Sequence, residues 1–507
     1  MLGSYYDING EETFDYYFSG TDIGRNPTSN KNRYYILNFD FSGIITESDE
    51  TIKRTFSKKT CDSLNDFIRT YCPHLPLLEV DDAPTLLSHF FSIIPHEIDG
   101  PIFVLIDEYD HFANELLSFD PVLFQDIVSH NGFIRKWYEV LKEATKRSVR
   151  RIFATGVSPV TLDSLTSGFN IGKNLTRSPL VNEMMGFTED EVLSLIQTTL
   201  PPEHIRPDML QTLRDYYNGY LFSEKGCERI FNSDMILYYL SSIVERGEPP
   251  ELLLDVNIAS DYGKLGRLTR LKSPESNTRV IKDIISGDEV SARLTPQFSM
   301  EKAFSRDDFI SLLFYLGLIT IKKAIPGEVT LTIPNYVIRG LYYDFFIQVI
   351  TEEGSTIVQH ERIREAVREL GFEGRCTMLI QLIEELLHGF SNRDFIGFDE
   401  KYIKIALLTF AHMSNLFLVR SEYEVANGYV DVALLHSEPW HPRYYALFEL
   451  KYLKGRDFSE ERADQLVREG MDQLIGYGSS PEFVGIENLK KWVLVFAGDR
   501  RIRSYEV

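Results

Sequence analysis

Residues 101–110 read PIFVLIDEYD, and this stretch decides the fold of the N-terminal part of the chain. Five apolar residues (102–106) run directly into three acids within four positions, Asp107, Glu108 and Asp110. A short, continuous apolar run is typical of a strand buried on both faces, as at the centre of a parallel sheet. Its carboxylates emerge at the carboxyl end of the strand, where open α/β sheets place their ligands. The stretch therefore predicts a ligand site at this edge of a sheet.

An apolar strand followed by Asp and Glu has the pattern of a Walker B strand. In that pattern the first acid, Asp107, holds Mg²⁺ through water, and the second, Glu108, orients the attacking water. The alternative is a core strand that ends in a solvated acidic turn. A Walker B strand needs a phosphate-binding loop upstream, and no G-x-x-x-x-G-K-[ST] string occurs in the 507 residues.

The sequence around this strand resembles the AAA-ATPase-like family. The segments that carry the resemblance are IDEYD, the pair Thr155-Gly156, and YYDIN (5–9), FDYYFSGTDIGRNPT (14–28) and YYILNFDFSG (34–43). The resemblance extends over nearly the whole chain. It implies that the sequence starts just after the family's phosphate loop, through real loss or a misplaced start. ATP is the family's nucleotide, and without the loop we expect no ATPase activity from this chain.

The resemblance also implies a role for Thr155. It places this residue at the end of the strand predicted at 151–156, where a polar side chain senses the γ-phosphate of a bound nucleotide. A Thr that caps a turn is the alternative.

Composition indicates a folded, multidomain protein. A chain of 507 residues, 43% hydrophobic and 25% charged, predicts two to four globular domains. The net charge of −22 opposes a strong non-specific grip on nucleic acid, although a local basic groove stays compatible with it. No apolar run has the length of a membrane span. The four scattered cysteines suggest reduced thiols, and hence a cytoplasmic protein, or a nuclear one in a eukaryote.

Strands and helices alternate along the first part of the chain. Strands predicted at 34–41, 102–106 and 151–156, with helices between them, indicate a parallel α/β sheet in residues 1–185. Helices near 188–195, 210–217 and 234–244 indicate a small helical lid in residues 186–290. Residues 305–345 read as helix, β-hairpin and helix, which suggests a winged-helix-like unit in 291–350. A polar break at 352–355 then predicts the start of a C-terminal domain, 355–507.

A second set of charged residues lies in this last domain. Residues 420–435 (RSEYEVANGYVDVALL) predict a strand that enters through Asn427-Gly428 and carries Asp431. Residues 444–451 (YYALFELK) predict the next strand, on which Glu449 and Lys451 share one face because side chains alternate along a strand. Two charges on a face between apolar neighbours cost desolvation unless something binds them. The arrangement gathers two carboxylates and an ammonium group at one place.

Asp431, Glu449 and Lys451 match the PD-(D/E)-x-K nuclease motif, with Val430 in place of its leading Pro. In that motif the two carboxylates hold Mg²⁺ or Mn²⁺, and the lysine positions the nucleophile and stabilises charge. The resemblance adds Gln473, on a helix predicted at 463–477, as a further candidate near the metal. Glu400 is an early acidic candidate of the same fold. A surface salt bridge in a hairpin is the alternative for Glu449 and Lys451.

The expected fold class is α/β: an incomplete P-loop-type parallel sheet with a helical lid and a winged-helix-like unit, joined to a PD-(D/E)XK restriction-endonuclease-like α/β domain. The expected function is metal-dependent cleavage of nucleic acid, DNA first, coupled to an ATPase-like regulatory domain. The catalytic candidates are Asp431, Glu449, Lys451, Gln473 and Glu108, and Asp107 and Thr155 are the nucleotide-site candidates. Asp107 also counts, with Asp431 and Glu449, among the metal ligands. The alternative is a non-catalytic, nucleotide-dependent switch whose nuclease fold only binds nucleic acid or a partner. The oligomeric state stays open.

Overall fold

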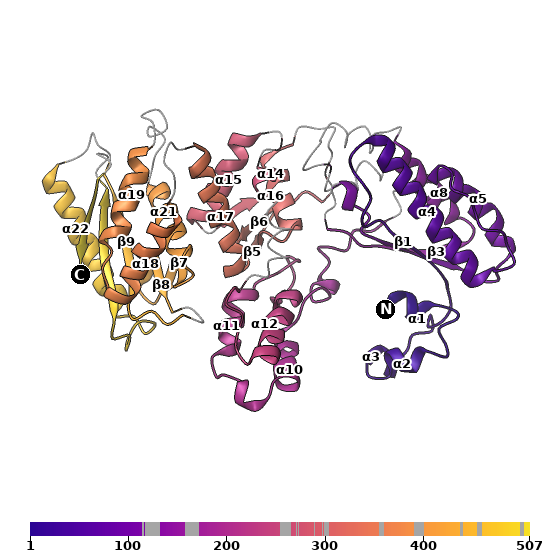
Figure 1. Cartoon of the computed structure of the whole chain (residues 1–507), viewed down its shortest axis with the longest axis horizontal. Coiled ribbons are helices and arrows are strands. Elements are labelled where there is room, and N and C mark those ends of the chain that lie inside the picture. The colour runs from indigo at the N-terminus through magenta and orange to yellow at the C-terminus, as the bar shows by residue number, and fades with distance from the viewer. Residues whose placement is uncertain are drawn as a thin grey trace. The chain divides into compact units, whose positions relative to one another are not determined.

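A computed structural model describes residues 1–113, 116, 132–157, 172–253, 265–269, 271, 273–287, 289–296, 298, 304–353, 359–389, 400–436, 440–453, 459–496 and 501–507 (Figure 1). These residues form two units. The first comprises 1–174 and 294–316, and the second 175–293 and 317–507. None of the described helices combines the length and the hydrophobicity that crossing a membrane requires. The domain boundary predicted at 355 lies outside the described residues.

The first unit is built on a three-stranded parallel sheet in the order β1-β2-β3, with β1 at Tyr35–Asp40, β2 at Ile102–Asp107 and β3 at Val149–Ala154. The predicted parallel sheet is thereby confirmed, and its central strand β2 is buried over most of its length. The parallel register pairs Asp40 with Asp107, so both strands end at one edge. β3 ends at Ala154, two residues before the predicted end. Thr155 still donates its amide to the carbonyl of Ile106 (2.8 Å).

Aromatic side chains join the helices of this unit to its sheet. The ring of Phe41, just beyond β1, stacks on Phe56 of α4 at 4.5 Å, and Trp137 of α8 packs edge-on to Phe39 of β1 at 5.0 Å. Side chains of Ser48 and Asp82 cap α4 and α5, as expected of residues at helix N-termini. The helices of the unit are α1 (Leu2–Tyr6), α2 (Phe14–Phe18), α3 (Asp22–Arg25), α4 (Asp49–Tyr71), α5 (Ala83–Ile93), η1 (Ile94–His96), α8 (Phe133–Ala144) and α16 (Arg306–Tyr315).

The second unit begins with helices. They are η3 (Pro179–Val181), α10 (Glu189–Thr199), η4 (Pro202–His204), α11 (Met209–Tyr217) and α12 (Ser233–Arg246). Thr188 and Glu191 form a capping box that starts α10, as its sequence predicts. The aromatic residues Tyr216, Tyr217 and Tyr220 are buried. They therefore pack a core, and the lid role of these helices stays a prediction.

A small antiparallel sheet follows in the order β4-β6-β5. The hairpin of β5 (Thr320–Ile325) and β6 (Glu328–Thr332) forms where the sequence predicts it. The helix α17 (Tyr336–Glu353) starts as predicted but continues past the predicted end at 345 and into the polar segment 352–355. Strand β4 (Glu289–Ala292) was not predicted, because four residues carry too little periodicity. The remaining helices here are α14 (Leu265–Leu268) and α15 (Pro274–Gly287). Tyr342 and Tyr343 of α17 are buried, which supports a packing role for this helix rather than contact with the groove of DNA. The winged-helix assignment stays a prediction.

The C-terminal part of the second unit contains a five-stranded sheet in the order β11-β10-β9-β8-β7. Its strands are β7 (Leu418–Val425), β8 (Gly428–Leu435), β9 (Tyr445–Tyr452), β10 (Leu489–Phe496) and β11 (Ile502–Glu506). β9 and β10 run parallel, and the other neighbours are antiparallel. The prediction of one strand across 420–435 was wrong: the chain reverses at Ala426-Asn427 and continues as β8 from Gly428, whose φ of 141° suits glycine.

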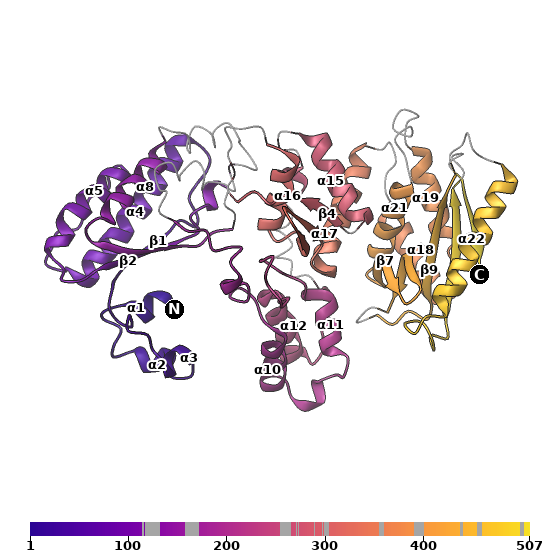
Figure 2. The same cartoon turned by 180° about the vertical axis from the view of Figure 1, so that it is seen from behind.

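Helices cover both faces of this sheet. Figures 1 and 2 show α21 with α18 and α19 on one side of the strands and α22 on the other. α21 contacts β7, β8 and β9, whereas α22 contacts β8, β9 and β10. The four helices are α18 (His360–Glu373), α19 (Thr377–Gly389), α21 (Glu400–His412) and α22 (Glu460–Gly478). Each face of the sheet is therefore packed against helices along these strands.

Candidate active site

Three acidic residues occupy corresponding register positions on strands β7, β8 and β9. Ser421 pairs with Val432 and Tyr423 with Val430, so the register places Glu422 opposite Asp431. The pairing of β8 with β9 ends at Val432 and Phe448, and the next position places Asp431 opposite Glu449. Residues opposite each other on antiparallel strands are close neighbours. The register thus brings the predicted pair Asp431 and Glu449 to neighbouring positions just past the last regular pair of β8 and β9. Glu422 has the corresponding position on β7, although it forms no regular pair with Asp431.

Asp431 is held in place by the strand that carries the other candidates. Its Oδ2 accepts a hydrogen bond of 2.7 Å from the amide of Leu450. Burial is the largest influence on this carboxyl and raises its pKa, and the charge of Glu422 acts in the same direction. The Leu450 amide and the ammonium groups of Lys404 and Lys451 oppose that shift. A carboxylate so placed gains from a cation beside it.

Glu449 and Lys451 share one face of β9, as their spacing predicts. The Lys451 Nζ lies 2.8 Å from the Glu449 Oε1. Glu449 is only 4% exposed, and Lys451 is partly buried. An ion pair removed from water to this degree gains little net stability, because the desolvation penalty offsets the attraction. Its presence inside the sheet suggests a purpose beyond folding.

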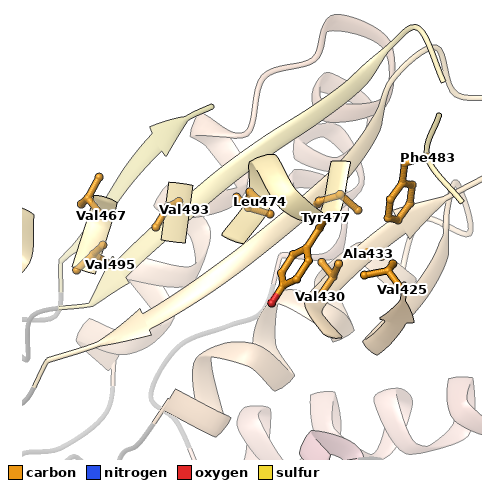
Figure 3. Packing of buried hydrophobic residues seen from close by; sticks show 10 residues of the cluster. Val425, Val430, Ala433, Val467, Leu474, Tyr477, Phe483, Val493 and Val495 are labelled. Atoms are coloured by element: carbon orange, nitrogen blue, oxygen red, sulfur yellow. The ribbon is translucent and has the colours of Figure 1, made fainter. Parts of the chain in front are cut away.

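Helix α22 contributes a residue that sequence reasoning missed. Tyr477 is buried, and Figure 3 shows its ring among Val430, Ala433 and Leu474. Burial raises the pKa of its hydroxyl, and the charges of Glu449 and Asp431 raise it further, so the hydroxyl lies within electrostatic reach of both acids. Gln473, the predicted candidate, is exposed and hydrogen-bonds to Tyr477. The i, i+4 spacing of the two residues was a usable signal for Tyr477.

Helix α21 contributes a second missed residue from the opposite face. Lys404 is 6% exposed, and its Nζ is paired with a carboxylate oxygen of Glu422. The available sequence signal was a lysine inside the apolar run KYIKIALLTF. Glu400 lies at the first position of the same helix. No group of three or more His, Cys, Asp and Glu side chains converges within the described part of the chain. Glu422 therefore does not join Asp431 and Glu449 as a third ligand in this arrangement.

Residues 398–506 match the family model of the PD-(D/E)XK nuclease superfamily. The C-terminal domain is a PD-(D/E)XK nuclease domain. Residues 1–166 match the model described as predicted AAA-ATPase, so the chain joins an AAA-ATPase-like region to this nuclease domain. No curated protein and no solved structure matches the chain. Both family matches agree with the domain arrangement that the sequence predicts.

The donor set of the nuclease domain fits a hard divalent cation. Asp431 and Glu449 offer carboxylate oxygens from neighbouring strands, and oxygen is the ligand that Mg²⁺ and Mn²⁺ prefer. No soft sulfur ligand occupies these register positions. The assignment of Asp431 and Glu449 as cation ligands stays a prediction.

The AAA-ATPase-like region gathers its candidates at the edge of the parallel sheet. Thr155 donates a hydrogen bond of 2.5 Å from its Oγ1 to the Oδ1 of Asp107. Asp40, which sequence reasoning missed, ends β1 beside Asp107. Burial acts to raise the pKa of Asp40, but hydrogen bonds from Ser42 and the charge of Lys59 outweigh it, and the pKa is lowered. Asp40 and Asp107 thus give this edge two adjacent carboxylates.

Two further acids of IDEYD have different surroundings. Glu108 follows the strand with a φ of 50°, and its Oε2 lies 3.0 Å from the Nδ1 of His111. Asp110 is fully buried and accepts a hydrogen bond of 3.0 Å from the amide of Val157. A Cβ at Gly156 would lie 2.2 Å from the same Asp110 oxygen, so only glycine fits there. Asp110 therefore braces the ends of β2 and β3 and is not available to a ligand.

Proposed function

We propose that the nuclease domain hydrolyses phosphodiester bonds of nucleic acid, DNA in the first instance, with Mg²⁺ or Mn²⁺. One observation carries this proposal: Asp431 and Glu449 directly follow the last regular pair of β8 and β9, and the Lys451 ammonium lies 2.8 Å from Glu449. Two carboxylates and one lysine in the interior of a sheet form a costly arrangement unless they bind a ligand.

The residues divide the chemistry among them. Asp431 and Glu449 would hold the cation, which acidifies water and offsets the charge of the phosphate when bound. Lys451 would orient the attacking water and stabilise the charge that develops on the phosphodiester oxygens. Tyr477, which is hydrogen-bonded to Gln473, would donate a hydrogen bond from α22 toward the two carboxylates. The Leu450 amide keeps Asp431 in register with the other groups.

End-labelled double-stranded and single-stranded DNA and RNA, incubated with the full chain and Mg²⁺ or Mn²⁺, test the proposal. We expect product from at least one DNA substrate, none with a chelator present, and none from Asp431→Asn. Absence of product from every substrate, with Mn²⁺ binding absent as well, would rule out the nuclease function.

We propose that the AAA-ATPase-like region regulates the nuclease domain through a bound nucleotide. Asp107, Thr155 and Glu108 lie at the carboxyl edge of its parallel sheet, where such sheets place ligands. Asp107 would hold Mg²⁺, Thr155 would sense the terminal phosphate and Glu108 would orient water. Cleavage measured with and without ATP, and with Asp107→Asn, tests this role. Equal rates in all three cases would contradict it.

A non-catalytic switch or interaction protein is the second candidate function. The net charge of −22 is a reason to keep it, because an acidic chain holds a nucleic-acid substrate for cleavage less readily. The Glu449–Lys451 contact is also compatible with a structural ion pair in which the two charges neutralise each other without a cation. In that case the chain would bind nucleic acid or a partner without releasing product, and Asp431→Asn would leave that binding unchanged.

A further inference from the structure

Lys404 is a buried lysine without a role in the proposed cleavage. It lies on α21, between apolar residues that pack against strands β7, β8 and β9, and its side chain is 7% exposed. Lysine is almost never buried unless it is paired. Its ammonium group is paired with Glu422, which is itself partly exposed at 41% of its side chain. The ion pair therefore joins a buried lysine of α21 to a partly exposed glutamate of β7.

Glu422 has an unusual backbone. Its φ of 47° lies in the left-handed region, which costs a residue other than glycine on the order of 1 kcal/mol. The strand register is the same before and after this residue, yet Glu422 and Asp431 do not pair. In this conformation Glu422 forms no regular strand pair with Asp431, and its carboxylate pairs with Lys404. The ion pair with Lys404 therefore supports a conformation that the strand alone would not favour.

The charges near Asp431 give a reason for holding the Glu422 carboxylate at Lys404. In their ionised forms, the carboxylates of Glu422, Asp431 and Glu449 and the ammonium groups of Lys404 and Lys451 carry one net negative charge. One divalent cation would reverse this to one net positive charge, which suits a phosphodiester anion. A Glu422 carboxylate directed at Asp431 would be a third oxygen donor, and like charges opposite each other on strands also destabilise a sheet.

We propose that Lys404 is a positioning residue of the nuclease site, which holds the carboxylate of Glu422 away from Asp431 and Glu449 and leaves them a two-carboxylate cation site open to substrate. This inference rests on the proposed nuclease function. Lys404 acts through Glu422 and does not touch the substrate.

The test compares Mn²⁺ binding and DNA cleavage for the full chain and for Lys404→Met, which keeps the length of the side chain and removes its charge. Glu422, once released, adds a carboxylate beside the cation, and affinity for hard cations rises with the number of charged ligands. We expect Mn²⁺ affinity, measured by calorimetry, to rise about tenfold and cleavage to fall about tenfold or more. A structural ion pair would instead lower stability and weaken both.

Glu422→Gln supplies an independent arm in case Lys404→Met does not fold. It leaves the Lys404 charge uncompensated near the site, so Mn²⁺ affinity should fall. The double variant should return close to the affinity of the native chain. Lys401→Met is the matched control, because Lys401 lies on the same helix with a side chain 57% exposed and pairs with Asp283. Lys401→Met changes the net charge of the chain by the same amount as Lys404→Met, and it should change neither Mn²⁺ affinity nor DNA cleavage.

The outcomes separate the two proposals. If the native chain neither binds Mn²⁺ nor cleaves DNA, the nuclease function itself fails. If the native chain does both, and Asp431→Asn does neither, the function stands. Lys404→Met with unchanged or weaker Mn²⁺ binding, or Glu422→Gln with unchanged or tighter binding, would then overturn the positioning role alone.

Discussion

The carboxylate of Asp431 accepts a hydrogen bond of 2.7 Å from the amide of Leu450, the residue between Glu449 and Lys451. This bond joins β8 directly to the segment of β9 that carries the other two candidate groups. It holds the first carboxylate at a set distance from the second, just beyond the last regular pair of the two strands, Val432 and Phe448. The geometry of the candidate site thus depends on one contact between a side chain and the backbone.

Asp431→Asn should abolish cleavage without unfolding the domain. The amide oxygen of Asn can still accept the Leu450 hydrogen bond, whereas the charge that binds a cation is lost. We expect a fall of at least about 10²-fold in cleavage, together with loss of Mn²⁺ binding. Gel assays on labelled DNA and calorimetry with Mn²⁺ measure the two effects. Glu424→Gln, exposed on the neighbouring strand, is the control and should leave both unchanged.

Lys451→Met should separate cation binding from cleavage. The variant keeps both carboxylates, so Mn²⁺ affinity should persist, while the positive charge beside the phosphodiester is lost. A cleavage rate lower by about 10²-fold is typical for one electrostatic contributor. Cleavage and thermal melting are measured on the same preparation. Unchanged cleavage combined with a lower melting temperature would identify the Glu449–Lys451 contact as a structural salt bridge.

Stability should fall at acidic pH because of His412. This residue is partly buried, and burial, with the charge of Arg339, lowers its pKa to about 4. The unfolded chain takes up a proton near pH 6.5, earlier than the folded chain does, so stability is present at neutral pH and is lost as the pH falls from 6.5 toward 4. Denaturant titrations at pH 7.5 and pH 5 measure the loss. His412→Gln should reduce the difference between the two pH values, whereas His360→Gln, at an exposed position, should not.

Residues 1–507 should not hydrolyse ATP above background. Positioning and electrostatics supply nearly all the catalysis of phosphoryl transfer, and the sequence has no G-x-x-x-x-G-K-[ST] loop to cradle the phosphates. Release of labelled phosphate from ATP is the measurement. Steady hydrolysis by the purified chain that disappears in Glu108→Gln would show that another part of the chain supplies these groups.

Local patterns were sufficient for the elements that carry the candidates. The apolar run of PIFVLID predicts β2, and its end at Asp107 follows directly from the composition of the stretch. The alternation in YYALFELK places Glu449 and Lys451 on one face of β9, because two residues on a strand complete one period. In the same way, the spacing of Gln473 and Tyr477 predicts a shared face of α22. These properties depend on neighbours along the chain, so the sequence by itself determined them.

Pairing between distant segments decided the remainder. Only the register of β7, β8 and β9 gives Glu422, Asp431 and Glu449 corresponding positions, and only helix packing brings Lys404 to Glu422. The sequence placed Asp110 with the other acids of its motif, but in the fold it is buried against Val157. Such contacts arise from the burial of surfaces far apart in the chain, where many registers are compatible with the same local pattern. The tertiary structure therefore decided which charged residues meet, although the sequence determined which strands carry them.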